Sequence, residues 1–349
     1  MTRQRNASAV RNFPRSYRLL SLGAILLLIL ISGGLFFIHA HSIAAQSGSG
    51  SFTFTAAGDY AQTTQTTASL KTIAQSGASF HLALGDIDES TTDTAAQWSS
   101  FIKSQLPSGF PFEIIPGDHD TSQSWATYTA DLPDKMGSTG SYGQQYYFNY
   151  PRTAPLARFI MISPGQTSQS YNKGSSGYKW VTSAITSART AGIHWVIVGL
   201  YENCFSLGSA HCSTDDILNL LVSQHVDLVL YAHKHDYEAS KQLAFNGTSC
   251  TSLTTSYNAN CVVNATSTMT RGNGTVIVID GTAGINPQLS ISQTDPAFQY
   301  FRASNGRGSN TTWGVMRISV SPTQLSEKFV PDQGLKGSGT FSDSFTING

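Results

Sequence analysis

Charged side chains are scarce in this sequence. Asp, Glu, Lys and Arg make up 12% of its 349 residues, against about 25% in an average soluble domain. The 21 basic and 21 acidic residues cancel, but residues 1–45 hold five of the arginines and no acid. The rest of the chain therefore carries 16 basic against 21 acidic side chains, a net charge of −5. A mildly acidic surface does not attract nucleic acid, so we expect no nucleic-acid partner.

The same N-terminal stretch, which lacks Lys, Asp and Glu, has the pattern of an export signal. Five arginines precede an apolar run over residues 19–38, as in a secretory signal peptide. The run is about as long as the 20 residues that a helix needs to cross a bilayer, and Ala44 and Ala45 offer small residues for cleavage. We interpret residues 1–45 as a signal peptide or an N-terminal membrane anchor, both alternatives remaining open, and 46–51 as a linker.

This interpretation predicts where the rest of the chain lies. The arginine-rich flank stays on the cytoplasmic side, so residues after the apolar run are expected to be extracytoplasmic. The protein is then either secreted or anchored, and it contacts a membrane only through residues 19–38 if these are not removed.

Cysteine is rare as well, and no Cys-x-x-Cys pair is present that would indicate zinc binding or redox chemistry. The four cysteines are Cys204, Cys212, Cys250 and Cys261. An even number of cysteines in an exported chain favours disulfide bonds. Three pairings are open, and we expect the local one, Cys204–Cys212 with Cys250–Cys261, which closes two short loops.

From residue 52 onward, short apolar runs alternate with polar segments. We predict strands at 52–57, 80–84, 112–115, 158–162, 195–200, 226–231, 276–279 and 315–320. Helices are predicted at 68–75, 95–105, 177–191 and 214–224. Several of the strands are continuous Val/Ile/Leu runs, which are typical of strands buried on both faces. The alternation indicates one α/β domain over 52–349, with the polar segment 243–274 as an irregular insertion.

Acidic and histidine residues follow the predicted strands at their carboxyl ends. Gly58-Asp59, Gly85-Asp86 and the run Gly117-Asp118-His119-Asp120 each follow one strand, and His233-Lys234-His235 follows another. Ligands of open α/β sheets gather beyond the carboxyl ends of the strands. A single Gly-Asp after a strand is usually a turn or a helix cap, but four such sites in order favour one shared metal site.

The residue types at these strand ends indicate which metals fit. His233 and His235 are two residues apart, so their imidazoles point the same way in an extended chain. Carboxylates combined with imidazoles suit Fe, Mn or Zn better than Ca or Mg. Two such ions about 3.5–4 Å apart activate water and hold a phosphoryl oxygen, so the expected cofactors are two divalent or trivalent ions.

The ordered series of motifs resembles that of the calcineurin-like metallophosphoesterases, and within them the purple-acid-phosphatase-like branch. In that family the series reads Gly-Asp, Gly-Asp, Gly-Asn-His-Asp/Glu, a His after a strand, and Gly-His-x-His. The resemblance covers nearly all of 52–345, including residues 178–181 and 339–341. It implies an α/β fold in the form of a four-layer αββα sandwich of two mixed sheets, with the site at the strand ends.

The resemblance also implies roles for single residues. The first metal would be held by Asp59, Asp86 and His235, and the second by Asp86, Asp118 and His233. Asp86 would thus bridge the two ions, and His119 would lie near the phosphate and assist the leaving group. The implied reaction is attack of a metal-activated water on a small phosphate monoester or diester, without a covalent enzyme intermediate.

Four positions depart from the family pattern. Asp118 replaces the family's Asn, Ala232 replaces a Gly, and Tyr201 stands where a His ligand is expected. Purple acid phosphatases use a Tyr ligand three residues after the second Gly-Asp, and Glu89 holds that position here, with Asp88 beside it. Either carboxylate offers an oxygen ligand. Tyr201 is interpreted as the loss of a second-metal ligand rather than as a functional replacement, so the second site is expected to be altered, weak or empty.

These observations leave three functional hypotheses. The first is an extracytoplasmic, metal-dependent phosphoesterase with an altered second-metal site. The second is a catalytically impaired relative that binds phosphate or another ligand on the same fold. The third is a cell-surface protein in which a metal only stabilises the fold.

Overall fold

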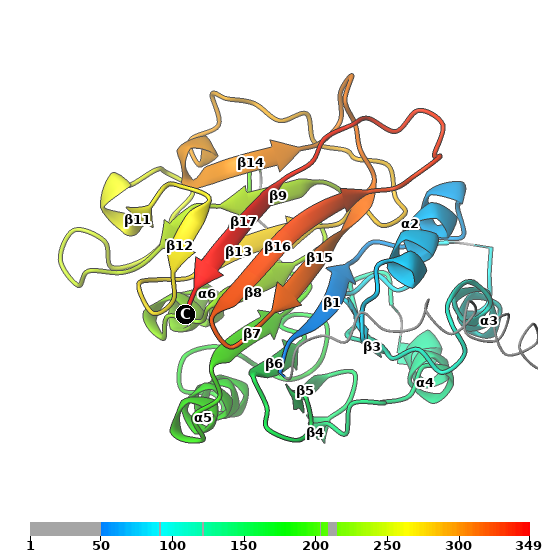
Figure 1. The fold of residues 1–349 in the computed structure, drawn as a ribbon, viewed down its shortest axis with the longest axis horizontal. Helices are drawn as coiled ribbons and strands as arrows, with labels where there is room; N and C mark the ends of the chain where they lie inside the picture. Colours follow the sequence, from blue (N-terminus) through cyan, green and yellow to red (C-terminus); the bar gives the residue numbers. More distant parts are fainter. Residues whose placement is uncertain (1–49, 91, 121, 203, 209–214) are drawn as a thin grey trace, which may run out of the picture. The chain divides into compact units, whose positions relative to one another are not determined.

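The computed structural model describes residues 50–349, apart from residues 91, 121, 203 and 209–214. Two large sheets dominate it (Figure 1). The seven-stranded sheet has the order β12-β17-β16-β15-β1-β2-β3, and the eight-stranded sheet the order β14-β9-β13-β8-β7-β6-β5-β4. In both sheets, parallel pairs such as β1–β2 and β7–β8 combine with antiparallel pairs such as β1–β15 and β5–β6, so both sheets are mixed.

The strands of the seven-stranded sheet are β1 (Phe52–Ala57), β2 (His81–Ala83), β3 (Phe112–Ile114), β12 (Thr268–Thr270), β15 (Gly314–Val320), β16 (Gln324–Pro331) and β17 (Ser344–Asn348). Those of the eight-stranded sheet are β4 (Thr139–Ser141), β5 (Gln145–Tyr150), β6 (Ala157–Ile162), β7 (Trp195–Gly199), β8 (Leu228–Tyr231), β9 (Tyr237–Ser240), β13 (Val276–Asp280) and β14 (Phe301–Asn305). The helices are α2 (Thr64–Gln75), α3 (Ala95–Gln105), α4 (Ser122–Asp131), α5 (Ser176–Thr190) and α6 (Asp215–Ser223).

The main hydrophobic core lies between the two sheets. Alternate residues of strands from both sheets enter it, as the two-residue period of a strand requires. Phe54 of β1 meets Phe159 of β6 edge to face, with ring centroids 4.9 Å apart, and stacks on Phe80 at 5.4 Å. Aromatic pairs of this geometry add to the burial that holds the sheets together.

Helices cover the outer faces of both sheets. Leu70 of α2 and Trp98 of α3 pack on the outer side of the β1–β3 region. Val181 of α5 and Leu221 of α6 pack on the outer side of β6–β8. Helix α3 begins with a capping box, in which Thr94 and Gln97 bond to each other's backbone N–H groups. The predicted αββα sandwich of two mixed sheets is confirmed.

Every strand and helix predicted from the sequence is present, with ends shifted by a few residues at most. The structure adds elements that the sequence does not indicate, among them α4, β4, β5, β9, β14, β16 and β17. Most of these are short or amphipathic strands in the antiparallel parts of the two sheets.

Within segment 243–274, predicted to be irregular, the chain forms short elements around one disulfide. A two-stranded sheet pairs β10 (Gln242–Leu243) with β11 (Val262–Asn264), and β12 joins β17 at the edge of the seven-stranded sheet. The predicted disulfide Cys250–Cys261 is confirmed. Cys212, the expected partner of Cys204, lies outside the described residues.

The proposed leader cannot be compared with the structure, since residues 1–45 and the apolar run 19–38 lie outside the described residues. In the part of the chain that the structure describes, no helix has both the length and the apolar character needed to cross a membrane.

Candidate metal centre

The loops that follow β1, β2, β3 and β8 meet at one end of the two sheets. Asp59, after β1, accepts a hydrogen bond from the backbone N–H of His233, after β8, at 2.9 Å. Asp86, after β2, accepts one from the backbone N–H of His119, after β3, at 2.9 Å. The strand-end residues that the sequence indicates are therefore gathered from both sheets.

The backbone at these positions is held in a conformation that non-glycine residues rarely adopt. Asp59, Asp86 and His233 have φ values of 64°, 43° and 71°. A left-handed backbone conformation costs free energy in a residue other than glycine, and residues that adopt it tend to cluster at functional sites. Gly117 is required for a steric reason, because a Cβ atom there would lie 2.1 Å from Asp86 Oδ1.

One group of side chains forms an open ligand set: Asp59, Glu89 and His235. His235 Nε2 lies 3.2 Å from Glu89 Oε1 and 3.7 Å from Asp59 Oδ1. The three potential ligand atoms all lie within 4.8 Å of one another. Asp59 Oδ1 and Glu89 Oε1 are buried and have no hydrogen-bond partner, which is costly for a carboxylate unless a cation is bound.

The electrostatics of this group also favour a cation. Burial, together with the neighbouring carboxylates of Asp86 and Glu89, raises the pKa of Asp59 well above its ordinary value. Clustered buried carboxylates repel one another, and a metal ion relieves both the repulsion and the loss of solvent. Two carboxylates and an imidazole are ligands that Mn, Fe and Zn accept, so the residues present fit a metal.

A second group surrounds the side chain of Tyr201, which follows β7 and is fully buried. Its hydroxyl donates a hydrogen bond to Asp86 Oδ2, and lies 2.6 Å from Asp118 Oδ1 and 2.8 Å from His233 Nδ1. These are the three side chains that the resemblance assigns to the second metal. The Tyr201 hydroxyl therefore fills the space that they share.

Both packing and charge hold Tyr201 in place as a neutral phenol. Its ring lies against Gly85, where a Cβ atom would come within 2.4 Å of the ring. Burial and the negative charges of Asp59 and Asp86 raise the pKa of Tyr201 far above its ordinary value. The neighbouring side chains of His233 and Tyr201 lower the pKa of Asp118.

His119 lies at the solvent side of the centre. Its side chain is 54% exposed, and Nε2 is 3.9 Å from Glu89 Oε2. One of its ring nitrogens also lies within 4.8 Å of carboxylate oxygens of Asp86 and Asp118. This position next to the ligand set leaves the imidazole free to reach a bound molecule.

Sequence motifs assign no role to two residues that shape the centre. Asp120 accepts hydrogen bonds from the backbone N–H groups of Ile87 and Gly117, the second at 2.8 Å, and so fastens two of the motif loops together. Gln288, on the loop after β13, places its side-chain amide 3.1 Å from His235 Nδ1. Asp120 is part of the motif run, whereas nothing in the sequence around Gln288 signals its place.

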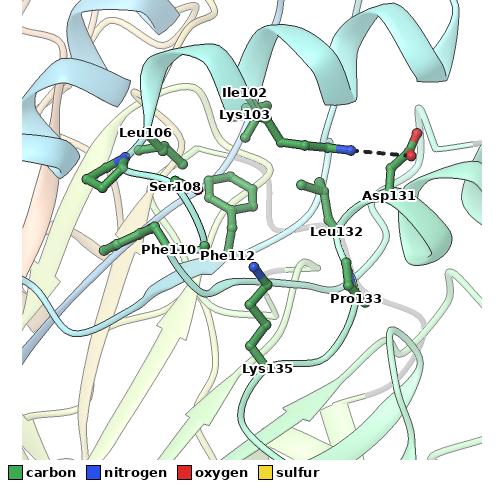
Figure 2. A pocket seen from close by; sticks show the side chains of 12 residues that line it. Ile102, Lys103, Leu106, Ser108, Phe110, Phe112, Asp131, Leu132, Pro133 and Lys135 are labelled. Atoms are coloured by element: carbon green, nitrogen blue, oxygen red, sulfur yellow. Dashed lines mark hydrogen bonds and ion pairs between the residues drawn. The ribbon is translucent and has the colours of Figure 1, made fainter. Parts of the chain in front are cut away.

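A separate pocket of about 280 Å³ lies between α3 and α4 (Figure 2). Phe112 and Leu132 form part of its apolar wall, and the ion pair Lys103–Asp131, at 3.3 Å, spans its rim. None of the strand-end residues discussed above lines this pocket, so we do not assign it to the metal centre.

The chain is similar to known proteins in sequence and in fold. No family model matches the chain. The chain is similar to purple acid phosphatase 15 of Arabidopsis thaliana, with 24% identity over 157 residues, which is 42% of this chain and 28% of the relative. Among solved structures it is similar to purple acid phosphatase PPD1 from yellow lupin (Lupinus luteus) seeds, with a TM-score of 0.62 and 16% identity over 86% of this chain and 54% of that one. It is also similar to PhoD, with a TM-score of 0.56 and 14% identity over 87% of this chain and 71% of that one.

These similarities confirm the resemblance to calcineurin-like metallophosphoesterases of the purple-acid-phosphatase-like branch, and the fold is that of this class. The chain spans 28% of the length of the Arabidopsis relative and about half of the lupin protein, at 54%.

Proposed function

We propose that this chain is a metal-dependent phosphoesterase with one strong metal site, at Asp59, Glu89 and His235, and an altered second position filled by Tyr201. It acts outside the cytoplasm on small phosphate monoesters or diesters. The observation that carries the proposal is the convergence of two buried carboxylate oxygens that accept no hydrogen bond with His235 Nε2, at the strand ends of a phosphoesterase fold.

The chemistry is divided between the metal and the protein. A bound Mn, Fe or Zn ion supplies Lewis acidity, which activates water and neutralises charge on a phosphoryl group. His119 is exposed beside the ligand set, and it donates a proton to the leaving oxygen of the ester, as a general acid does. Asp120 keeps the loops of Asp86 and His119 in register.

Two observations support a location outside the cytoplasm. The Cys250–Cys261 disulfide is the kind of bond that persists in oxidising compartments. The arginine-rich start and apolar run of residues 1–45 have the order of an export signal.

Asp59→Asn should strongly reduce metal-dependent ester hydrolysis. The substitution keeps the size of the side chain but removes a charge from the ligand set. We therefore expect the rate of hydrolysis to fall at least 100-fold, which is about the largest loss seen when a residue that only hydrogen-bonds to a metal ligand is replaced. Hydrolysis of 4-nitrophenyl phosphate and of its bis-ester is measured with added Mn, Fe or Zn.

Asp131→Asn serves as the matched control, because it also replaces an aspartate by asparagine, but at a surface carboxylate that pairs with Lys103 and is not part of the ligand set. It should leave turnover unchanged. If the wild-type chain binds metal but hydrolyses neither ester, or if Asp59→Asn is as active as the wild type, the proposal is wrong.

The second candidate is a binding protein without turnover, and the position of Tyr201 favours it. The phenol hydroxyl engages three side chains that would otherwise hold a second ion. A centre with one metal retains affinity for a phosphate group, while it lacks the second ion that a two-metal site uses to stabilise the attacking and leaving oxygens.

A further inference from the structure

An open groove of about 700 Å³ lies beside the metal centre. Its walls are partly polar and partly apolar, and it runs between the start of α2 and the loop after β13. The side chains that give it this polar character are Thr63, Gln65, Asn286, Gln288 and Arg307. Amides, a hydroxyl and a guanidinium suit a hydroxylated, charged ligand better than an apolar one.

Residues of the groove contact the proposed metal ligands directly. Gln288 lines the groove and lies 3.1 Å from His235 Nδ1. Ile285 also lines it, and its backbone N–H donates to the carbonyl of Asp59 at 3.2 Å. The groove thus borders two of the three residues of the ligand set, through the backbone of Asp59 and through the ring nitrogen of His235 that does not face Asp59 and Glu89.

Arg307 gives the groove its charge. Its backbone N–H donates to the carbonyl of Leu289 at 2.7 Å, and its side-chain Nε to Ser290 Oγ at 3.3 Å. Among the described residues, no acidic side chain forms an ion pair with it. The terminal N–H groups of an arginine that is held by Nε form a fork that matches a carboxylate or phosphate.

We propose that this groove binds the leaving group of the substrate and selects hydroxylated leaving groups that carry an anionic group. The proposal rests on the proposed function, since it places the scissile phosphate at the metal centre. Arg307 pairs with the distal anion, and Gln65, Asn286 and Gln288 bond to the hydroxyl groups. The substrate class is therefore a small polar phosphate ester with a second negative charge.

The test compares two ligands that share the phosphate but differ in the group esterified to it. The metal-loaded chain is titrated with 3-phosphoglycerate and with phenyl phosphate in an isothermal titration calorimeter. We expect 3-phosphoglycerate to bind about tenfold more tightly than phenyl phosphate. Arg307→Ala should remove most of that preference and leave phenyl phosphate unaffected. A tenfold difference corresponds to about 1.4 kcal/mol, close to the contribution of one hydrogen bond to a charged group.

Arg152→Ala is the matched control, because it removes another exposed arginine, one that bonds to the carbonyl of Lys135. It should leave both affinities unchanged. Equal affinity for the two ligands in the wild type, or equal losses in both variants, would overturn the groove assignment. Binding needs no turnover, so an intact preference without hydrolysis refutes only the catalytic part of the proposed function.

Discussion

Tyr201→His should raise the metal content of the chain from one to two equivalents and increase ester hydrolysis by about tenfold or more, a barrier change of about 1.4 kcal/mol. The reason is geometric. The Tyr201 hydroxyl contacts Asp86, Asp118 and His233 at once, and an imidazole frees these three ligands while adding a fourth. Metal analysis after desalting, together with hydrolysis of 4-nitrophenyl phosphate, measures both effects.

Tyr201→Phe separates the loss of the hydroxyl from the gain of a ligand. Phenylalanine removes the hydroxyl but supplies no fourth ligand, so we expect one metal equivalent and no rise in hydrolysis. A Tyr201→His variant that still binds one metal would show that the phenol is not what blocks the second site. A fall in hydrolysis on this substitution would instead identify Tyr201 as a working ligand.

Glu89→Gln should weaken metal binding by about 100-fold or more. This is at least as large as the losses seen when residues that only hydrogen-bond to metal ligands are replaced. Glu89 Oε1 is buried, has no hydrogen-bond partner and lies 3.2 Å from His235 Nε2. The amide keeps the shape of the side chain but removes its charge from the ligand set. Competition between the protein and a chelating dye for Mn or Zn gives the affinity.

Asp88→Asn is the matched control for this experiment, since the sequence leaves open which of the two carboxylates acts as a ligand. Asp88 Oδ1 accepts a hydrogen bond from the backbone N–H of Ser90 at 2.8 Å, and Asp88 is absent from the ligand set. We expect metal affinity close to that of the wild type. A larger loss in Asp88→Asn than in Glu89→Gln would contradict our assignment of the ligand.

Much of the fold can be predicted because its central strands are continuous apolar runs. Strands β6, β7, β8 and β13 are buried along their whole length. Each can therefore be recognised from its own apolar sequence, without knowledge of the strands that pair with it. Strand β16 escapes prediction, because it alternates buried and exposed residues and includes charged ones. Such a strand gains its stability from pairing with its neighbours β15 and β17, and the residues of the strand alone do not reveal that pairing.

The site is predictable where its residues follow strands, and not elsewhere. Asp59 and His235 stand in motifs at strand ends, so the sheet brings them together. That the Tyr201 hydroxyl lies between three proposed ligands depends on how the two sheets approach each other. The contact between Gln288 and His235 spans 53 residues, and the groove with Arg307 arises from loops whose sequences carry no motif.

Metal stoichiometry of the wild-type chain tests the central claim most directly. The purified protein is loaded with excess Mn, Fe or Zn, desalted and analysed for bound metal. The one-metal centre at Asp59, Glu89 and His235 predicts one tightly bound equivalent. Two tightly bound equivalents would contradict the assignment of Tyr201 as the group that fills the second position, and no bound metal would contradict the centre itself.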